Sequence, residues 1–298
     1  MTRKSIYCIL AVLILAALLM SGVGCSKESE VSALKPGTTL YVGTTTSLYN
    51  TGLWGYLEPM FEEEYNASLH VLSLGSGTAI KYGTNGDVDV LTVHDKPAEL
   101  KFISEGNGVE RIPFAYNYFL IVGPESDPAG IKDMTPGDAF KKLYESGDGK
   151  FVSRGDNSGT HSMEKRIWSA AGYTDYDAVK SAGTAAGWYK EGGGDMESTL
   201  RKASELEAYT LTDMGTYVSY KAELSLVPIV DEDDILLNVY SVIVCTKSTT
   251  NNEAKLEMAN NMVEFLTSKE IQELIGKYGV KDYGLQLFTP CFGNEPTA

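Results

Sequence analysis

The stretch from Phe151 to Glu164, FVSRGDNSGTHSME, carries the residues of this chain best suited to chemistry. A short apolar run closes into Gly155-Asp156-Asn157, which is turn composition, and Ser158 or Asp156 can cap the helix that follows. The stretch therefore predicts a helix N-terminus with free N–H groups, two hydroxyls and Arg154. Such a site favours a bound anion, because the helix dipole and the guanidinium both attract negative charge. Taken alone, the stretch fits an ordinary capped helix equally well.

A second hydroxyl-rich turn lies far upstream. Residues 38–43 read as a strand of β-branched and aromatic residues that ends in glycine. The run Thr44-Thr45-Thr46-Ser47 follows at once, and apolar residues at helical spacing come after it, from Leu53 to Phe61. Hydroxyls thus stand again at a strand-to-helix turn. Two turns of this kind make an oxyanion clamp the better hypothesis.

A third turn of the same type is Gly75-Ser76-Gly77-Thr78, between a strand at 69–74 and a helix that begins near Ala79. Its glycines allow a ligand to approach the backbone closely. The turn is not a phosphate-binding P-loop, because the Gly-Lys-Ser/Thr ending is missing. By itself this turn would be interpreted as an ordinary link between a strand and a helix.

The charge balance restricts the partners. The 298 residues carry a net charge of −15 and no basic stripe, which argues against nucleic acid. An anion must therefore be bound by local dipoles and by Arg154 rather than by the overall field. The acidic run Asp231-Glu232-Asp233-Asp234 predicts a solvated loop and not a metal site, because adjacent side chains are not spaced to converge.

The N-terminus predicts export. A basic start precedes the apolar run Ile6 to Met20, which is short for a membrane span, and small residues then lead to Cys25. We expect a signal peptide over 1–24. The position of Cys25 is similar to that in a lipobox, although Gly22 stands where leucine is usual. Cys25 would then be lipidated and 25–36 would be a flexible tether; an uncleaved anchor is the alternative.

Strands alternate with helices along the rest of the chain, which predicts an α/β fold of two lobes, each a mostly parallel sheet flanked by helices. Because the hydroxyl-rich turns all follow strands, we expect the ligand in the cleft between the lobes. Closure would be a hinge motion near Gly123 and Asn238. The expected boundaries are 37–122 for lobe 1, 123–236 for lobe 2 and 237–298 for the return to lobe 1.

Two cysteines remain in the mature part of the chain, Cys245 and Cys291. They could pair in an exported protein, but a core of this size does not require a disulfide. Cys245 lies in an apolar strand and could equally be a buried thiol.

Six segments spread over nearly the whole mature chain resemble the tungstate-binding proteins of ABC importers, which are type II substrate-binding proteins. These segments are Thr44–Ser47, Gly75–Thr78, Asp89–Leu91 with Val93–Asp95, Ser153–Asp156 with Ser158–His161, Tyr209–Asp213, and Tyr283-Gly284 with Leu287–Pro290. The resemblance implies a type II periplasmic-binding-protein-like fold and a receptor rather than an enzyme. It implies no cofactor or metal, and a permease and an ATPase as partners. The receptor would be anchored by lipid to the outer face of the cell membrane.

By the same resemblance the ligand is a tetrahedral oxyanion, tungstate first, with molybdate, sulfate or phosphate as alternatives. The implied binding residues are Thr45, Thr46, Ser47, Ser76, Gly77, Thr78, Arg154, Ser158, Gly159 and Thr160. A deprotonated dianion only accepts hydrogen bonds, whereas a protonated phosphate also needs an acceptor, and only Asp156 is near. Leu48-Tyr49 is bulkier than expected after the threonines, and Met214 stands where this family often has arginine.

Three other readings compete. Gly155-Asp156-Asn157-Ser158-Gly159 superficially resembles the nucleophile motif of a serine protease, but the histidines lack a supporting pattern and Ser158 fits better as a cap. A zinc site from His161, Glu164, His94 and Asp95 competes with a solvated or hydrogen-bonded pair on one helix face, which is favoured. A membrane-tethered sensor or an enzyme on the same fold is the third, since fold alone does not exclude it.

Overall fold

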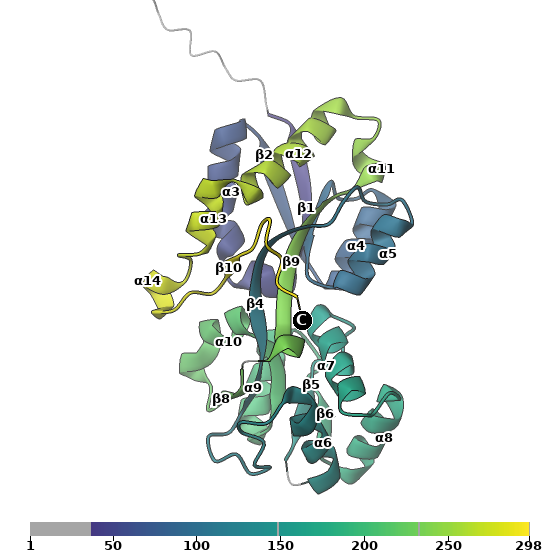
Figure 1. Ribbon diagram of the computed structural model, residues 1–298, viewed down its shortest axis with the longest axis vertical. Helices are drawn as coiled ribbons and strands as arrows, with labels where there is room; N and C mark the ends of the chain where they lie inside the picture. The colour runs from purple at the N-terminus through teal and green to yellow at the C-terminus, as the bar shows by residue number, and fades with distance from the viewer. Residues whose placement is uncertain (1–36, 148, 232, 298) are drawn as a thin grey trace, which may run out of the picture. The chain divides into compact units, whose positions relative to one another are not determined.

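The computed structural model describes residues 37–147, 149–231 and 233–297 (Figure 1). The predicted signal peptide (1–24), the tether (25–36) and Cys25 lie outside the described residues. Within the described ranges, no helix combines the length and the apolar character needed to cross a bilayer.

Three parallel strands build one end of the fold. They are β1 (Thr39–Thr45), β2 (Ser68–Leu74) and β3 (Val90–Val93), and β1 lies between the other two. One face is covered by α3 (Leu53–Tyr65), α12 (Glu253–Thr267) and α13 (Lys269–Ile275), and the other by α4 (Ser76–Asn85) and α5 (Lys96–Ser104) (Figure 1). Because parallel strands end on the same edge of a sheet, the turns after all three strands meet there.

Two long antiparallel strands run from this end of the fold to the other (Figure 1). They are β4 (Ile112–Gly123) and β9 (Leu237–Val244). The first part of β4, up to Tyr118, pairs with β9; from Phe119 on, β4 pairs with β7 (Thr210–Asp213) and β8 (Val227–Val230). The strand order is β10-β4-β9-β3-β1-β2, with β10 (Thr289–Pro290) on the outer side of β4.

The other end of the fold contains a second, two-stranded parallel sheet and most of the remaining helices. Its elements are α6 (Pro136–Ser146), β5 (Phe151–Ser153), α7 (Gly159–Ala170), α8 (Tyr176–Ala186), β6 (Tyr189–Glu191), α9 (Met196–Leu206) and α10 (Met214–Tyr220). Short helices complete the described chain: α2 (Thr46–Asn50), η1 (Lys221–Glu223), η2 (Asp234–Leu236), α11 (Thr246–Thr249) and α14 (Val280–Tyr283).

The predicted α/β class is confirmed, with helices flanking the sheets. Pairing is parallel within β1–β3 and within β5–β6, and antiparallel wherever β4 and β9 take part, because the chain crosses between the two ends in opposite directions. The expected lobe boundaries remain a prediction.

The question left open for the cysteines has a structural answer. Cys245 and Cys291 are both free and both buried. Burial raises the pKa of the Cys291 thiol to about 12 and also raises that of Cys245. Both therefore remain neutral thiols that pack as small apolar side chains.

Aromatic packing holds the second end of the fold together and fixes the strand that leads into Arg154. The Phe140 ring lies 4.6 Å from Trp168 and 5.1 Å from Phe151, measured between ring centroids, and none of these side chains is more than 1% exposed. Since Phe151 begins β5, this core sets where the following turn emerges.

Replacing Phe140 with alanine should lower the free energy of unfolding by about 3–5 kcal/mol, because the ring leaves a cavity that its neighbours fill only in part. Urea denaturation measures the loss. Leu100→Ala is the control, since Leu100 is 51% exposed and surface changes usually stay within about 0.5 kcal/mol. A Phe140→Ala loss as small as the control's would contradict this account of the core.

Candidate anion-binding site

A small polar cavity with about 170 Å³ of space between atoms lies where the turns meet. Its lining is Thr45, Thr46, Ser47, Gly75, Ser76, His94, Arg154, Ser158, Gly159 and Thr160. The structure thus brings together all the predicted site residues except Gly77 and Thr78, which are exposed on the first turn of α4. It adds Gly75 and His94.

The hydroxyl run after β1 forms one wall. Thr45 caps α2, its Oγ1 accepting from the Leu48 N–H at 3.3 Å, and it lies 3.2 Å from the Ser47 Oγ. Ser47 Oγ in turn is 3.1 Å from Nε2 of His94, the residue that follows β3. Leu48 is buried in the core and Tyr49 is exposed, so the bulky pair does not intrude on the cavity.

Helix α4 presents its N-terminus to the cavity. Gly75 is the N-cap and offers no side chain, so the first N–H groups of α4 have no capping partner. Ser76, the first residue of the helix, is buried. This arrangement leaves backbone donors and the positive end of the helix dipole for a ligand.

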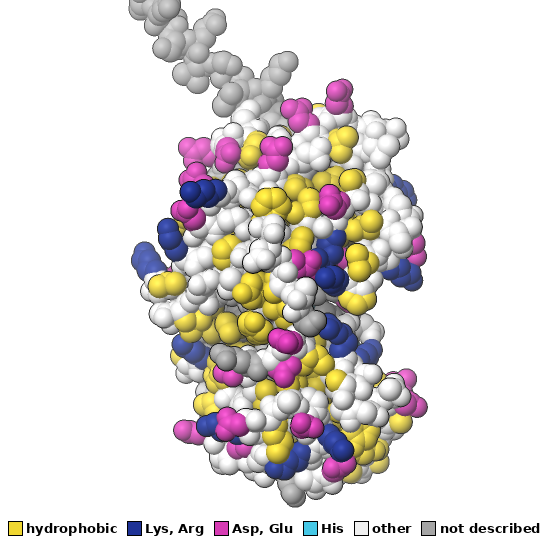
Figure 2. All heavy atoms as spheres, viewed as in Figure 1, with side chains coloured by type: hydrophobic (Ala, Val, Ile, Leu, Met, Phe, Trp, Pro, Cys, Tyr) yellow, Lys and Arg dark blue, Asp and Glu magenta, His cyan; other side chains and the backbone are white. Residues whose placement is uncertain are grey.

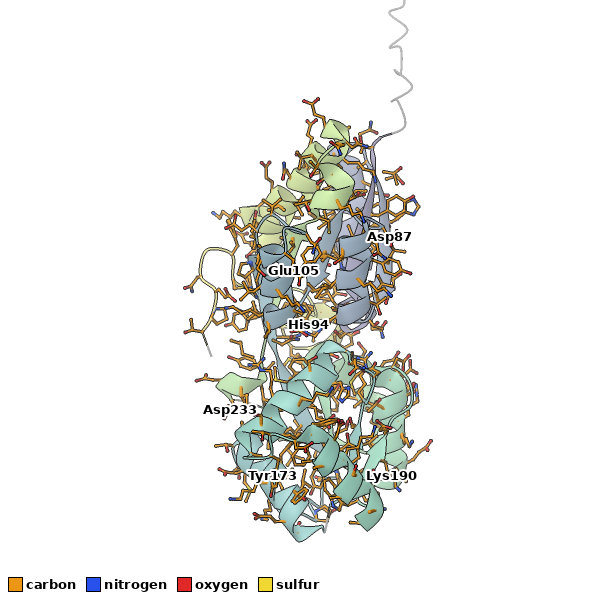
Figure 3. The ribbon with its side chains drawn as sticks, turned by 90° about the vertical axis from the view of Figure 1, so that its right-hand side faces the viewer. Asp87, His94, Glu105, Tyr173, Lys190 and Asp233 are labelled. Atoms are coloured by element: carbon orange, nitrogen blue, oxygen red, sulfur yellow. The ribbon has the colours of Figure 1, made fainter. Side chains whose placement is uncertain are left out.

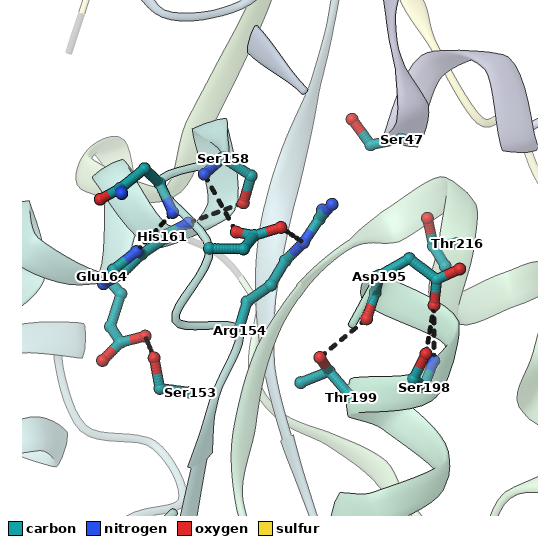
Figure 4. Close-up of polar contacts among 12 residues, drawn as sticks. Ser47, Ser153, Arg154, Ser158, His161, Glu164, Asp195, Ser198, Thr199 and Thr216 are labelled. Carbon is teal, nitrogen blue, oxygen red and sulfur yellow. Dashed lines mark hydrogen bonds and ion pairs between the residues drawn. The ribbon is translucent and has the colours of Figure 1, made fainter. Parts of the chain in front are cut away.

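The opposite wall is the turn between β5 and α7 (Figure 4). Ser158 caps α7 by accepting from the His161 N–H at 3.3 Å, as predicted. Arg154 is only 6% exposed and donates from Nε to Asp156 Oδ2 at 2.8 Å. Asp156 Oδ1 accepts from the Ser158 N–H at 3.0 Å. Asp156 therefore orients Arg154 and closes the turn with both oxygens engaged, while the guanidinium end points toward Ser47 (Figure 4).

Three buried polar atoms in the lining have no hydrogen-bond partner among the described residues: Ser76 Oγ, Thr160 Oγ1 and His94 Nδ1. An unsatisfied buried group costs about 1–3 kcal/mol, so such groups are uncommon without a reason. Here the three come from different segments and surround one cavity. A polar ligand in the cavity would supply the missing partners.

The charge of the site resides on Arg154. Burial, and then the nearby Arg154 charge, lower the pKa of His94 to about 4, so this imidazole is neutral at pH 7. The same guanidinium also acts on two aspartates. Hydrogen bonds from Ser198 are the main cause of the lowered pKa of Asp195, and the Arg154 charge adds to them. Burial raises the pKa of Asp213, and Arg154 acts against it. The cavity therefore offers one permanent cation among neutral donors, which suits an anion.

The two walls touch at Gly159. A Cβ added there would lie 2.3 Å from His94 Cε1 and 3.0 Å from Ser76 Oγ. His94 lies at the junction of the two ends of the fold (Figure 3). Glycine at this position therefore lets the N-terminus of α7 reach the segments that follow β2 and β3.

Three of the residues considered for a zinc site, His161, Glu164 and Asp95, make hydrogen bonds within the protein instead. His161 Nδ1 accepts from the Asn157 N–H, its Nε2 bonds to Tyr176, and Glu164 accepts from Ser153. The Asp95 side chain caps α5 by accepting from a backbone N–H. Across the residues that the structure describes, no three His, Cys, Asp or Glu side chains are grouped to hold a metal ion.

A wider groove on another face is a different kind of surface. Hydrophobic side chains gather across the middle of this face, with acidic side chains below them (Figure 2). The lining is Tyr118, Leu120, Met214, Tyr217, Val218, Lys221, Pro228, Asp231, Asp233, Asp234 and Leu285. Met214, which stands where an arginine was expected, thus faces this groove and not the anion cavity.

Comparison with known proteins agrees with the fold. The model of the PBP superfamily domain matches residues 32–270. The chain is 38% identical to the tungstate-binding protein TupA of Peptoclostridium acidaminophilum, over 96% of this chain and 98% of that protein. It is 41% identical to a putative ABC transporter anion-binding protein of Haloferax volcanii, over 90% of this chain and 75% of that protein.

Among solved structures, the tungstate-binding protein TupA from Desulfovibrio alaskensis G20 superposes with a TM-score of 0.72 at 38% identity. The match covers 86% of this chain and 100% of the D. alaskensis chain. The fold and the cavity between its two ends define a solute-binding protein. The chain belongs to the PBP superfamily, in the family of the TupA tungstate-binding proteins.

Gly159→Ala should weaken anion binding, because the added Cβ collides with His94 and holds the two walls apart. Overpacking of this kind costs about 1–3 kcal/mol, or roughly 5- to 150-fold in affinity. Isothermal titration with tungstate measures the change. Gly55→Ala is the control, since a Cβ there meets no atom within 4 Å. Equal binding by both variants would show that close contact at Gly159 is not needed.

Proposed function

We propose that this protein is the extracytoplasmic receptor of an ABC importer and that it captures tungstate in the cavity around Arg154. The observation that carries the proposal is the set of unpartnered buried atoms on Ser76, Thr160 and His94, three residues that line the same cavity as Arg154. The relatives from P. acidaminophilum and D. alaskensis are named as tungstate-binding proteins. Molybdate, which has nearly the same shape, is the first alternative.

The donor set suits a dianion without protons. Hydroxyls, backbone N–H groups and the Arg154 guanidinium all donate, and tungstate only accepts. His94 joins them when Ser47 donates to its Nε2, because the ring proton then resides on Nδ1, which is buried and has no partner among the described residues. Asp156, whose carboxylate accepts from Arg154 and Ser158, is not among the residues that line the cavity, so it gives a protonated phosphate no acceptor there. Phosphate is therefore the weaker candidate, whereas sulfate, which also lacks protons at neutral pH, meets the same donors as tungstate.

Binding without catalysis fits the same geometry. The Ser47–His94 pair has the spacing of a nucleophile and its base, but Nδ1 of His94 has no carboxylate to orient it. Its pKa of about 4 also makes it a poor base at neutral pH. We therefore assign the pair to ligand contact rather than to acyl transfer.

We further infer that the lobes meet where β4 changes partners. The first lobe would comprise 37–118 and the return from 237, and the second lobe 119–236, a few residues from the expected boundary. Asn117 and Asn238 are paired residues of β4 and β9, and Asn238 Nδ2 donates to Asn117 Oδ1 at 3.0 Å. We place the hinge at this pair. Gly123 is a poorer candidate, because a Cβ there would lie 2.4 Å from the Tyr209 ring, within the second lobe.

The membrane attachment is proposed from the sequence. A signal peptide over 1–24, lipidation of Cys25 and a tether over 25–36 would hold the receptor at the outer face of the cell membrane. This is the periplasmic side in a cell with two membranes. There it would deliver its ligand to a permease driven by an ATPase. The Haloferax volcanii relative, named as a putative ABC transporter anion-binding protein, supports delivery to such a permease.

Arg154→Ala should abolish tight tungstate binding. Removing one partner of a buried, hydrogen-bonded charge pair costs about 2–5 kcal/mol, or roughly 30- to 5,000-fold in affinity. Isothermal titration of the chain from residue 26 onward with tungstate, molybdate, sulfate and phosphate measures the effect. Arg166→Ala is the control, because this arginine is exposed on α7 and lies outside the cavity lining. Absence of oxyanion binding by the unaltered protein would overturn the proposed function.

Cys25→Ser should release the full-length protein from the membrane. Lipid on Cys25 would place the unaltered protein in the membrane fraction and in the detergent phase of a phase-separation assay. The variant, exported but without lipid, should appear in the soluble fraction. An unaltered protein that already partitions into the aqueous phase would contradict lipidation.

A further inference from the structure

A chain of hydrogen bonds runs from the anion-binding turn into the core of the second lobe. The Asn157 N–H donates to His161 Nδ1 at 2.8 Å, and His161 Nε2 lies 2.8 Å from the Tyr176 hydroxyl. The hydroxyls of Tyr176 and Tyr189 are 2.5 Å apart, and Tyr189 donates to Glu164 Oε1 at 3.1 Å. All of these side chains are buried except Tyr176, which is partly exposed.

The directions of the bonds in this chain follow from its two ends. A backbone N–H can only donate, so Nδ1 of His161 is the acceptor and its proton resides on Nε2, which donates to Tyr176. At the other end Tyr189 donates to Glu164, so Tyr189 accepts from Tyr176.

Glu164 keeps this direction in both of its protonation states. Its Oε1 accepts from Tyr189 and from the Trp168 indole at 3.2 Å, while its Oε2 lies 2.5 Å from Ser153 Oγ. Burial raises the pKa of Glu164 to about 7. A proton on Oε2 is satisfied by Ser153, so Oε1 remains the acceptor of the chain with or without that proton.

The turn held by this chain has a demanding backbone. Gly155 has φ 65° and Asn157 has φ 59°, both in the left-handed region. Left-handed backbone is costly for a residue with a side chain, although asparagine tolerates it best. The bond to His161 Nδ1 fixes the Asn157 N–H in this conformation, next to Ser158 and Asp156. The orientation of Arg154 depends on the same turn.

We propose that Glu164, Tyr189, Tyr176 and His161 are positioning residues that hold His161 in its Nε2–H tautomer and so fix the turn that presents Arg154 and Ser158 to the anion. The inference deepens the proposed function and rests on it. A neutral His161 agrees with the proposal. Burial and then Lys165 lower its pKa to about 4, Lys180 acts in the same direction, and Asp156 and Glu191 act against it.

Tyr176→Phe removes the link between His161 and Tyr189. Tungstate affinity should fall by roughly tenfold, the size of one lost buried hydrogen bond. Tyr173→Phe is the matched control, because this tyrosine packs against Trp168 with its hydroxyl outside the chain of bonds. Isothermal titration compares both with the unaltered protein. Unchanged affinity in Tyr176→Phe would overturn the inference, whereas no binding by the unaltered protein would overturn the proposed function instead.

The tautomer provides a readout that loss of packing alone does not move. The chain has three histidines, so long-range proton–nitrogen NMR spectra can resolve His161. We expect Nε2–H in the unaltered protein and Nδ1–H, or a mixture, in Tyr176→Phe. A spectrum with Nδ1–H in the unaltered protein would overturn the inference.

Two substitutions at Glu164 complete the test. Glu164→Gln retains a carbonyl for Tyr189 and an amide that donates to Ser153, so it should keep the tautomer and bind within about twofold of the unaltered protein. Glu164→Leu removes the acceptor and should behave like Tyr176→Phe. If Glu164→Leu does not fold, Tyr176→Phe and Glu164→Gln decide the question. Loss of the tautomer or of affinity in Glu164→Gln would overturn the inference.

Discussion

Buried hydrogen-bond donors that lack acceptors are the constraint on which this structure depends. A protein interior rarely leaves polar groups without partners, because each one forfeits its hydration. Here Ser76, Thr160 and His94 present such groups to one cavity, next to the charge of Arg154. The protein supplies only part of the compensation, through Asp156. An anion would supply the rest, so the site is built around the ligand's charge.

The sheet topology brings these donors together. Because β1, β2 and β3 are parallel, their carboxyl ends place Ser47, Ser76 and His94 on one edge. The turn after β5 faces that edge from the other end of the fold, where β4 and β9 carry the chain across. Helix N-termini then bring backbone N–H groups that need no net positive charge, which explains how a chain of net charge −15 can hold an anion.

Rigidity of the site comes from the layer behind it. Asp156 holds Arg154, and Ser158 caps α7. His161 links the turn to a polar chain that ends at Glu164. Around this chain, the rings of Phe140, Phe151 and Trp168 pack closely. A well-held donor loses little entropy when it binds, so such a layer favours affinity and selectivity together.

The sequence by itself determined the α/β class, the three hydroxyl-rich turns and the caps, because local composition and spacing decide these features. It also identified Arg154 and most of the lining. Only the tertiary structure decided that His94 lines the cavity and that Met214 and the exposed side chain of Thr78 do not. Helix α8 and strand β6, which supply Tyr176 and Tyr189, were not predicted from the sequence. The physical reason is that these roles depend on contacts between segments far apart in the chain, which no local pattern encodes.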